Sequence, residues 1–405
     1  MSSRQYDIVV FGLGYTGNLT AEHIAQSLPI DLKWALAGRT ESKLRAVAEE
    51  LKFLNPDRIQ PGIEICNLND ADLSALAKKT KLMIATVGPY GRHGEHAFKA
   101  CAENGTHYLD VTGEIPFVAD MIRKYERSAK ASGSIMFSQI GIESGPPDLI
   151  AWSLVESIKK RFSAPTGEVV VCLHDISAKP SGGTLSSALS FMENFTLKQI
   201  KESMIPYAIS PASGPKVPSP ISWTTKIFGI RAVRDLGILT TAIQASSDVA
   251  IVQRSWGFLN YGPKFQYHEY MKSRNYLTGI LTHFAILAGG IILAIPFLRN
   301  TAKRFVVQPG HGPTKEESSR ERFEFRGIGT PDVPGQAPAR AYCKFSYQGS
   351  LYTYTGISLA EAAISILRDD HKLGGGIYTP AVLGQQFVDR LQANGVKIEN
   401  GFYED

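Results

Sequence analysis

The sequence is poor in cysteine and carries only a small excess of positive charge. Its four cysteines lie far apart among 405 residues and form no CxxC pair or other metal-ligand spacing. We therefore expect no metal site and reduced thiols in a cytoplasmic compartment. Lysine and arginine outnumber aspartate and glutamate by 43 to 38, and a net charge of +5 is too small to indicate nucleic-acid binding.

The sequence also predicts neither a secretory leader nor multiple membrane spans. Residues 1–6 contain no apolar core before the first predicted strand, so we expect no signal peptide. Hydrophobic residues make up 43% of the chain and charged residues 20%, which is typical of a globular protein. At ~100 to 200 residues per domain, this length predicts two or three domains.

One long uncharged segment is the exception to this composition. Residues 275–298 contain no Asp, Glu, Lys or Arg, although basic residues flank them at Lys272, Arg274, Arg299, Lys303 and Arg304. The length permits a transmembrane helix, which needs ~20 apolar residues. Three interpretations are open: a helix buried in the second domain, a monotopic helix that dips into one leaflet, and a single span.

Strands and helices alternate along the first third of the chain. The pattern predicts strands at 6–11, 32–37, 63–66, 81–87, 106–109 and 134–138, with helices between them. Repeated βα units predict a parallel sheet covered on both faces, with ligands at the carboxyl ends of the strands. The predicted fold class is therefore α/β: a Rossmann-type doubly wound sheet with a second α+β domain that contains a mixed sheet.

A glycine-rich turn follows the first predicted strand and opens a helix. It contains Gly12, Gly14 and Gly17 in a GxGxxG pattern, with Tyr15 and Thr16 between the last two. Gly12 would make the tight turn, Gly14 would let a pyrophosphate approach the backbone, and Gly17 would allow close helix packing. The context predicts dinucleotide binding, against the alternative of a purely structural turn.

The end of the second strand indicates which dinucleotide binds. Arg39 stands where an acidic residue would accept from a ribose 2′-hydroxyl, and Thr40 and Lys43 follow it. A planar guanidinium suits a 2′-phosphate, so we predict NADP(H). In the alternative, Arg39 and Lys43 are solvated charges at the start of the next helix.

The loop after the fourth strand supplies further candidates. Val87, Gly88, Pro89 and Tyr90 are expected to contact the nicotinamide side of the cofactor. Tyr90 and His93 are also candidate proton donors at the cleft mouth. In the alternative, this loop is an ordinary turn rich in glycine and proline that contacts no ligand.

Two acidic residues follow the fifth strand. Glu114 is expected to reach the same crevice as a candidate substrate contact. Asp110 fits a capping or scaffold role as well as a substrate contact.

Motifs spread over nearly the whole chain form a specific combination. They are GLGYTG at 12–17, AGRTESKL at 37–44, VGPYGRHG at 87–94, YLDVTGE at 108–114, SGGT at 181–184, PGHGP at 309–313 and GGIYTPA at 375–381. In this combination the chain resembles the saccharopine dehydrogenase-like oxidoreductases, and in particular their branch of trans-acting enoyl reductases and lipid-droplet-associated members. Two departures are Ile142-Glu143, where relatives show Phe-Asp, and Asn67 in place of an aspartate that would lie near the adenine.

The resemblance implies an NADPH-dependent reductase, with the C=C bond of a polyketide- or lipid-type enoyl thioester as its substrate. We assign residues 1–140 to the NADP-binding domain and 141–340 to a substrate or oligomerisation domain that contains the uncharged segment. The resemblance implies that a helical region at 341–405 packs back on the first domain. The turn made by Ser181, Gly182, Gly183 and Thr184 is a candidate substrate contact or, alternatively, a tight structural turn.

Two other functions remain open. The same hydride geometry serves ketone or imine reduction, and a lipid-associated protein could bind NADPH without catalysis. The candidate partners are an apolar or carrier-bound acyl substrate, a polyketide synthase, a second copy in a homodimer, and a membrane or lipid-droplet surface. The uncharged segment disfavours saccharopine itself as the substrate, because the carboxylates of saccharopine need charged contacts.

Overall fold

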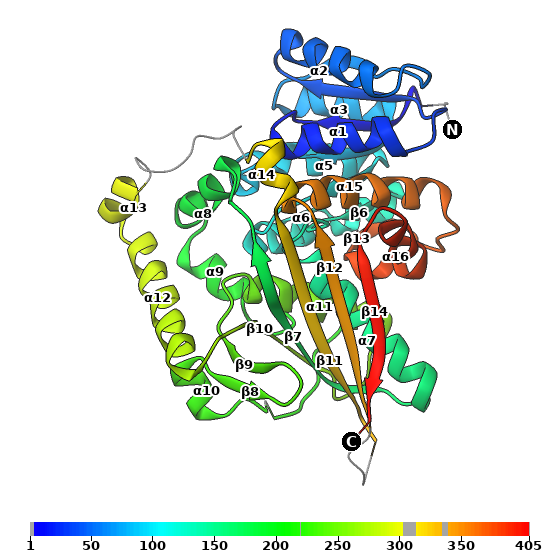
Figure 1. Cartoon of the computed structure of the whole chain (residues 1–405). Coiled ribbons are helices and arrows are strands. Elements are labelled where there is room, and N and C mark those ends of the chain that lie inside the picture. The colour runs from blue at the N-terminus through cyan, green and yellow to red at the C-terminus, as the bar shows by residue number, and fades with distance from the viewer. Residues whose placement is uncertain (1–3, 219, 303–312, 334–338, 405) are drawn as a thin grey trace.

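A computed structural model describes residues 4–218, 220–302, 313–333 and 339–404 (Figure 1). Lys303, Arg304 and all but the last residue of the PGHGP motif therefore lie outside the described residues. Two sheets form the molecule, one at the amino-terminal end and one built from the later strands.

The first sheet confirms the predicted Rossmann-type, doubly wound architecture. Its strands within the described chain are all parallel and pair in the order β13-β6-β5-β4-β1-β2-β3. Ile8, Val9 and Val10 are fully buried in β1, as expected for a central strand covered on both faces. The strands are β1 (Tyr6–Phe11), β2 (Trp34–Gly38), β3 (Gly62–Ile65), β4 (Thr80–Ala85), β5 (His107–Asp110), β6 (Ile135–Phe137) and β13 (Gly376–Tyr378).

The helices of this half follow the predicted alternation. They are α1 (Tyr15–Ser27), α2 (Glu41–Leu54), α3 (Asp70–Lys79), α4 (Tyr90–His93), α5 (Glu95–Asn104) and α6 (Ile115–Ser132). Local signals set their ends: the Asn69 side chain accepts a hydrogen bond from the Asp72 backbone N–H at the start of α3, and Gly133 ends α6 at φ 81°.

The second sheet is mixed, which confirms the prediction for that half. Its described strands pair in the order β14-β12-β11-β7-β10-β9-β8, and β10 runs parallel to β7 while the other pairs are antiparallel. The helix α7 (Gly145–Phe162) lies on it, and it comes close because Gly327 has no side chain where Ile150 packs. The strands are β7 (Thr166–Ser177), β8 (Arg231–Val233), β9 (Gly237–Thr240), β10 (Gln266–Lys272), β11 (Arg322–Pro331), β12 (Arg340–Gln348) and β14 (Lys397–Tyr403).

The apolar spacing over residues 184–205 predicts one helix, but two helices occupy this segment. They are α8 (Gly182–Asn194) and α9 (Leu197–Ser203). Thr196 starts α9 with a capping box, in which its hydroxyl accepts from the Gln199 backbone N–H and the Gln199 side chain accepts from Thr196 N–H. These bonds favour a new helix start over continuation of α8.

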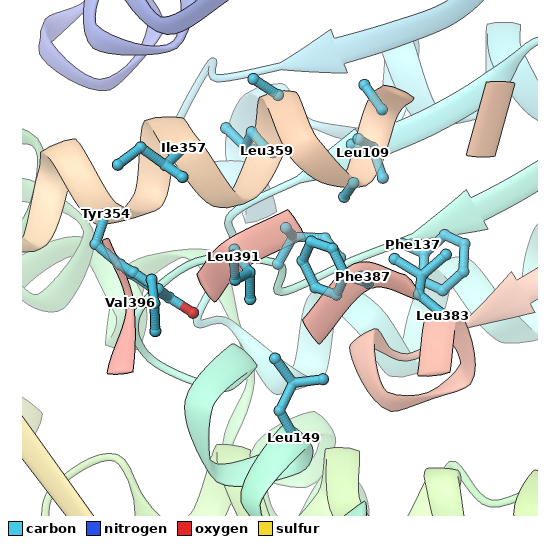
Figure 2. Close-up of a cluster of buried hydrophobic side chains, with 14 of the residues drawn as sticks. Leu109, Phe137, Leu149, Tyr354, Ile357, Leu359, Leu383, Phe387, Leu391 and Val396 are labelled. Atoms are coloured by element: carbon cyan, nitrogen blue, oxygen red, sulfur yellow. The ribbon is translucent and has the colours of Figure 1, made fainter. Parts of the chain in front are cut away.

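A helix from the carboxyl-terminal part joins the two sheets. α15 (Leu351–Arg368) packs against α1, and most of its residues are buried. Figure 2 shows Tyr354, Ile357 and Leu359 of α15 in one apolar cluster with residues of the first sheet, of α7 and of α16 (Gly384–Ala393). The short helix η2 (Pro380–Leu383) precedes α16, and β13 and β14 show that this region also extends both sheets.

The uncharged segment forms an exposed helix, so its interpretation as a buried helix is wrong. In α12 (Tyr276–Ala294) the buried residues are Gly279 and His283, whereas large apolar side chains along it face solvent. Figure 1 shows α12 and α13 (Pro296–Ala302) along one edge of the molecule. The remaining helices are α10 (Trp223–Phe228), α11 (Ala245–Leu259) and α14 (Lys315–Ser319).

Candidate cofactor and active site

The glycine turn between β1 and α1 has the geometry of a phosphate-binding turn. Gly12 adopts φ 98°, and a Cβ at this position would lie 2.5 Å from Cγ2 of Val87. At Gly17 a Cβ would lie 2.0 Å from the Gly12 carbonyl oxygen, so only glycine lets the helix start this close to the strand. Within the described chain, the space above Gly14 is open to 4 Å, and no side chain caps the N–H groups of the first turn, which Tyr15 and Thr16 begin. This open cradle fits a dinucleotide pyrophosphate.

A group of cations lies at the carboxyl end of β2. Arg39, Thr40 and Lys43 are exposed there, as is Arg92 of α4. Burial lowers the pKa of His93, and the positive charges of Arg92 and Arg39 lower it further, so these three side chains lie close together. Neither arginine forms an ion pair with a carboxylate in the described part of the chain, which leaves both guanidinium groups available to an anion.

The loop after β4 lies where the two halves of the molecule meet. Val87 and Pro89 are half-buried and Gly88 is exposed. A Cβ on Gly88 would lie 3.7 Å from Oγ of Ser187, so α8 from the second half approaches this loop. The loop therefore lies between the glycine turn and α8, and we refer to the region where these three segments meet as the crevice.

Tyr90 does not occupy the position expected for a proton donor. Its side chain is only 6% exposed, its hydroxyl donates to the carbonyl oxygen of Ala85 at 2.9 Å, and its ring packs against Phe117. A hydroxyl committed to the protein interior does not reach a substrate. Tyr90 is part of the scaffold of the loop.

Glu114 also has a structural position in place of the expected substrate contact. Both of its carboxylate oxygens accept backbone N–H groups, from Tyr90 and from Gly91, each at 2.8 Å. The side chain is 4% exposed, and burial raises its pKa. Asp110 is buried too, and it accepts from the backbone of Thr112 and Gln139, which supports the scaffold role weighed for it.

The Ser181–Thr184 turn begins α8 and contacts the cofactor turn through two tyrosines. Oγ of Ser181 accepts from the Thr184 backbone N–H at 3.3 Å, while the hydroxyl of Tyr352 lies 2.8 Å from Oγ1 of Thr184 and accepts from Ser181 N–H. The Tyr352 ring packs edge-to-face on Tyr15, with ring centroids 5.2 Å apart. Gly182 and Gly183 form the first turn of α8. The structure thus brings the predicted cofactor and substrate residues together.

Glu143 is an acidic side chain near the loop after β4, because it lies close to Glu114, which binds the backbone of Tyr90 and Gly91. It is exposed to solvent, yet protein surrounds it so closely that desolvation, together with the charge of Glu114, raises its pKa. We interpret these two observations as a carboxyl group at the floor of a crevice. Its Oε2 atom lies directly over Gly113, where a Cβ would be 1.9 Å away, so glycine at position 113 makes room for this carboxyl group.

A pair of buried carboxyl groups lies behind Glu143. Glu269 accepts from the hydroxyl of Tyr267 at 2.7 Å and from Nε2 of Gln244 at 3.2 Å. Asp248 accepts from Oγ of Ser144 at 2.7 Å, but its second oxygen has no donor among the described residues. Burial raises the pKa of Glu269 to about 7 and that of Asp248 as well. A proton shared between the two carboxyl groups satisfies both observations.

The sequence signals for these acidic residues are weak. Glu143 stands out in the sequence only as a departure from the family pattern. Glu269 occupies a buried phase of the β10 alternation, and a charge at such a position indicates a buried polar site.

Comparison with known proteins agrees with this geometry. Residues 8–137 match the family model of the saccharopine dehydrogenase NADP binding domain. A Mycobacterium tuberculosis protein provisionally named a trans-acting enoyl reductase is 30% identical over 432 aligned residues, which cover 98% of this chain and 97% of the relative. The trans-acting enoyl reductase of Mycobacterium ulcerans is 29% identical over 426 residues, with 98% of each chain covered.

Solved structures share the fold at low sequence identity. The saccharopine dehydrogenase (L-Glu forming) of Saccharomyces cerevisiae matches with a TM-score of 0.55 and 10% identity over 98% of this chain and 100% of its own. A homospermidine synthase of Legionella pneumophila, solved with NAD, also matches with a TM-score of 0.55 and 10% identity, over 100% of this chain and 93% of its own.

The fold and the phosphate-binding turn define a nicotinamide-dinucleotide-dependent oxidoreductase. With a relative at 30% identity over its full length, the chain belongs to the saccharopine dehydrogenase-like oxidoreductase family, as its motifs indicated.

The shared proton predicts a pH-dependent stability. The pKa of Glu269 is about 7 in the folded protein and ~4.3 in an unfolded chain. Between these two pH values the native state therefore binds a proton that the unfolded chain has lost. The free energy of unfolding should therefore fall as the pH rises from about 5 to about 8. Glu269→Gln should reduce this fall, since its amide can donate to Asp248 without titrating.

Urea unfolding at several pH values measures this effect. Glu50→Gln, an exposed substitution of the same chemistry on α2, should leave the pH profile unchanged. Asp148, whose pKa burial raises to about 7, should maintain part of the slope in every variant. An identical slope in wild type and Glu269→Gln would contradict the shared proton.

Proposed function

We propose that the protein is an NADPH-dependent enoyl reductase, which acts in trans on the C=C bond of a polyketide- or lipid-type enoyl thioester. The proposal is carried by an open dinucleotide turn together with a solvent-accessible carboxyl group, Glu143, whose neighbour Glu114 binds the backbone of the loop after β4. The names of the full-length relatives support the reaction class.

The cations at the end of β2 support NADPH over NADH. A 2′-phosphate carries the charge that distinguishes the two cofactors, and Arg39 and Arg92 offer two unpaired guanidinium groups. Asn67 lies at the end of β3, and its amide donates to Asp72 at 2.9 Å, which makes it a structural contact of that turn.

The chain's own contribution to the reduction is a proton. When bound, NADPH supplies the hydride that adds to the β-carbon of the enoyl group. Glu143 would then hold the proton that the α-carbon receives, because its raised pKa favours the protonated form that a donor requires. After each turnover, the exposed carboxylate can take up a proton from water.

The charges in the crevice support a neutral substrate. Glu143 shares this region with the buried pair Asp248 and Glu269, and its charge raises the pKa of both. The pair keeps one negative charge when it shares a proton, and this charge would repel a substrate that bears carboxylates, such as an amino acid. An acyl thioester has no such charge on the reacting end.

The cofactor assignment predicts a selective loss of affinity. Arg39→Ala and Arg92→Ala should each weaken NADPH binding by about 10- to 100-fold, the range for one lost charge-assisted contact, and leave NADH binding nearly unchanged. Isothermal calorimetry measures both constants. Lys160→Ala, which removes an exposed cation from the end of α7, is the matched control. Equal losses for NADPH and NADH would contradict the 2′-phosphate contact.

The proton-donor assignment predicts a lower reaction rate without a loss of cofactor affinity. Glu143→Gln should lower kcat by about 100-fold or more, the usual contribution of a general acid, at an unchanged NADPH affinity. Wild-type activity should fall as the pH rises through the raised pKa of Glu143, and this dependence should vanish in the variant. Glu143→Asp should restore part of the rate. A Glu143→Gln enzyme with the wild-type rate and pH profile would remove Glu143 from the mechanism.

The reaction itself is tested by NADPH consumption. We expect oxidation of NADPH with enoyl thioesters of coenzyme A or an acyl carrier, together with one equivalent of saturated thioester by mass spectrometry. Ketones and imines of matched chain length should react more slowly. Preferential reaction with a ketone or imine would favour that class of reductase, and no oxidation with any of them would favour a binding protein.

A further inference from the structure

The outer edge of the second half carries an apolar surface that is exposed to solvent. α12 has a mean hydropathy of 2.0, and large apolar residues of α12 and α13 are exposed along its length, with Leu277 at 67% and Phe297 at 77%. A contiguous row of exposed, large apolar side chains on a soluble monomer marks an interaction surface. We define the apolar ridge by its exposed members: Leu277, Leu281, Phe284, Leu287, Ile291, Ile292, Ile295, Phe297 and Leu298.

Both ends of the ridge are fastened to the same folded body. Near the start of α12, Thr240 donates to the Gly279 carbonyl oxygen, and Thr241 lies 2.7 Å from Nδ1 of His283. At the other end, buried Arg299 pairs with Glu193 of α8 at 3.1 Å. A 19-residue helix is about 28 Å long. Because both of its ends are held, α12 cannot cross a bilayer unless the Arg299 contact breaks, and it fits a position parallel to a surface.

The amino-terminal end of the ridge carries aromatic and cationic side chains. α10 packs against α12 and exposes Trp223 at 69%, and Tyr276 is exposed at 56%. Lys226 lies on the same helical face as Trp223, and Lys272 and Arg274 precede α12. None of these three cations has a carboxylate partner among the described residues. Nζ of Lys272 does lie 3.0 Å from Nε2 of His174. Amphipathic aromatics and cations without carboxylate partners beside an apolar surface are typical of contact with anionic lipid headgroups.

The charges argue against a second copy of this chain as the occupant. Residues 272–302 contain no Asp or Glu, and α10 contains none either. A second copy with the same surface would therefore bring cations without partners and no complementary charge.

We propose that α10, α12 and α13 form a monotopic membrane-binding surface, with the apolar ridge in the interfacial layer of one leaflet and Lys226, Lys272 and Arg274 at anionic headgroups. The surface binds the lipid bilayer and does not span it. This inference concerns a surface outside the crevice and does not depend on the proposed reaction.

Flotation of the full-length protein with lipid vesicles tests this proposal. Wild type should float with vesicles of phosphatidylserine and phosphatidylcholine, and less with phosphatidylcholine alone or in high salt. The triple variant Leu281→Gln, Phe284→Gln and Ile291→Gln should lose binding, because these exposed side chains provide the buried apolar area. Lys226→Ala and Arg274→Ala should each weaken binding about fivefold.

Matched controls separate this effect from misfolding. Phe53→Gln removes an apolar side chain that is 86% exposed on α2, and it should float as wild type does. Thermal melting and NADPH calorimetry should be unchanged in the triple variant. Light scattering gives the decisive alternative: a wild-type dimer that ignores vesicles and becomes a monomer in the triple variant would make the ridge a subunit interface and overturn the proposal. Absence of both vesicle binding and dimerisation would also overturn it.

Discussion

The position of the cofactor turn relative to the second sheet depends on the close contact between α15 and α1. Gly356 allows this contact, since a Cβ there would lie 2.9 Å from the backbone of Leu19 and Thr20. The opposite side of α15 packs into the cluster of Figure 2 with α7 and α16, so one buried helix orients both sheets. Its first turn carries Tyr352, which contacts Tyr15 at the cofactor turn and the Ser181 turn of α8. The packing of α15 in the apolar core therefore determines how the cofactor turn and the Ser181 turn are placed relative to each other.

The first sheet could be predicted from the sequence because its information is local. Each βα unit has a buried strand, a turn and an amphipathic helix, and these repeat within about 30 residues. The second sheet was predicted only in outline. Its strands come from positions as distant as Thr166 and Tyr403, and strand pairing over such distances leaves no local signal. β13 shows the same limit, because three residues near Ile377 complete the first sheet from the other end of the chain.

The site residues divide in the same way. The spacing of Gly12 and Gly17 predicted close backbone approach, and that is a local requirement which the structure meets. Tyr90 and Glu114 were assigned from their place at strand ends, but their hydrogen bonds turn them inward to Ala85 and to the backbone of Gly91. A sequence pattern can place a residue near the site. It does not show whether other atoms of the protein already form hydrogen bonds with that residue's polar groups. Glu143 required the fold, because its crevice is made by segments far apart in the chain.

One helix connects the crevice with the apolar ridge. α8 begins at the Ser181 turn, passes Gly88 of the cofactor loop at Ser187, and reaches Arg299 of α13 through Glu193. Its 13 residues span about 20 Å, so the edge that we assign to lipid lies within one helix length of the site that we assign to reduction. An acyl chain held at a lipid surface would need to travel about this distance to bring its reacting end to the loop at Gly88. The two proposals are independent in their tests, and the position of α8 gives a physical reason why both surfaces occur on the same chain.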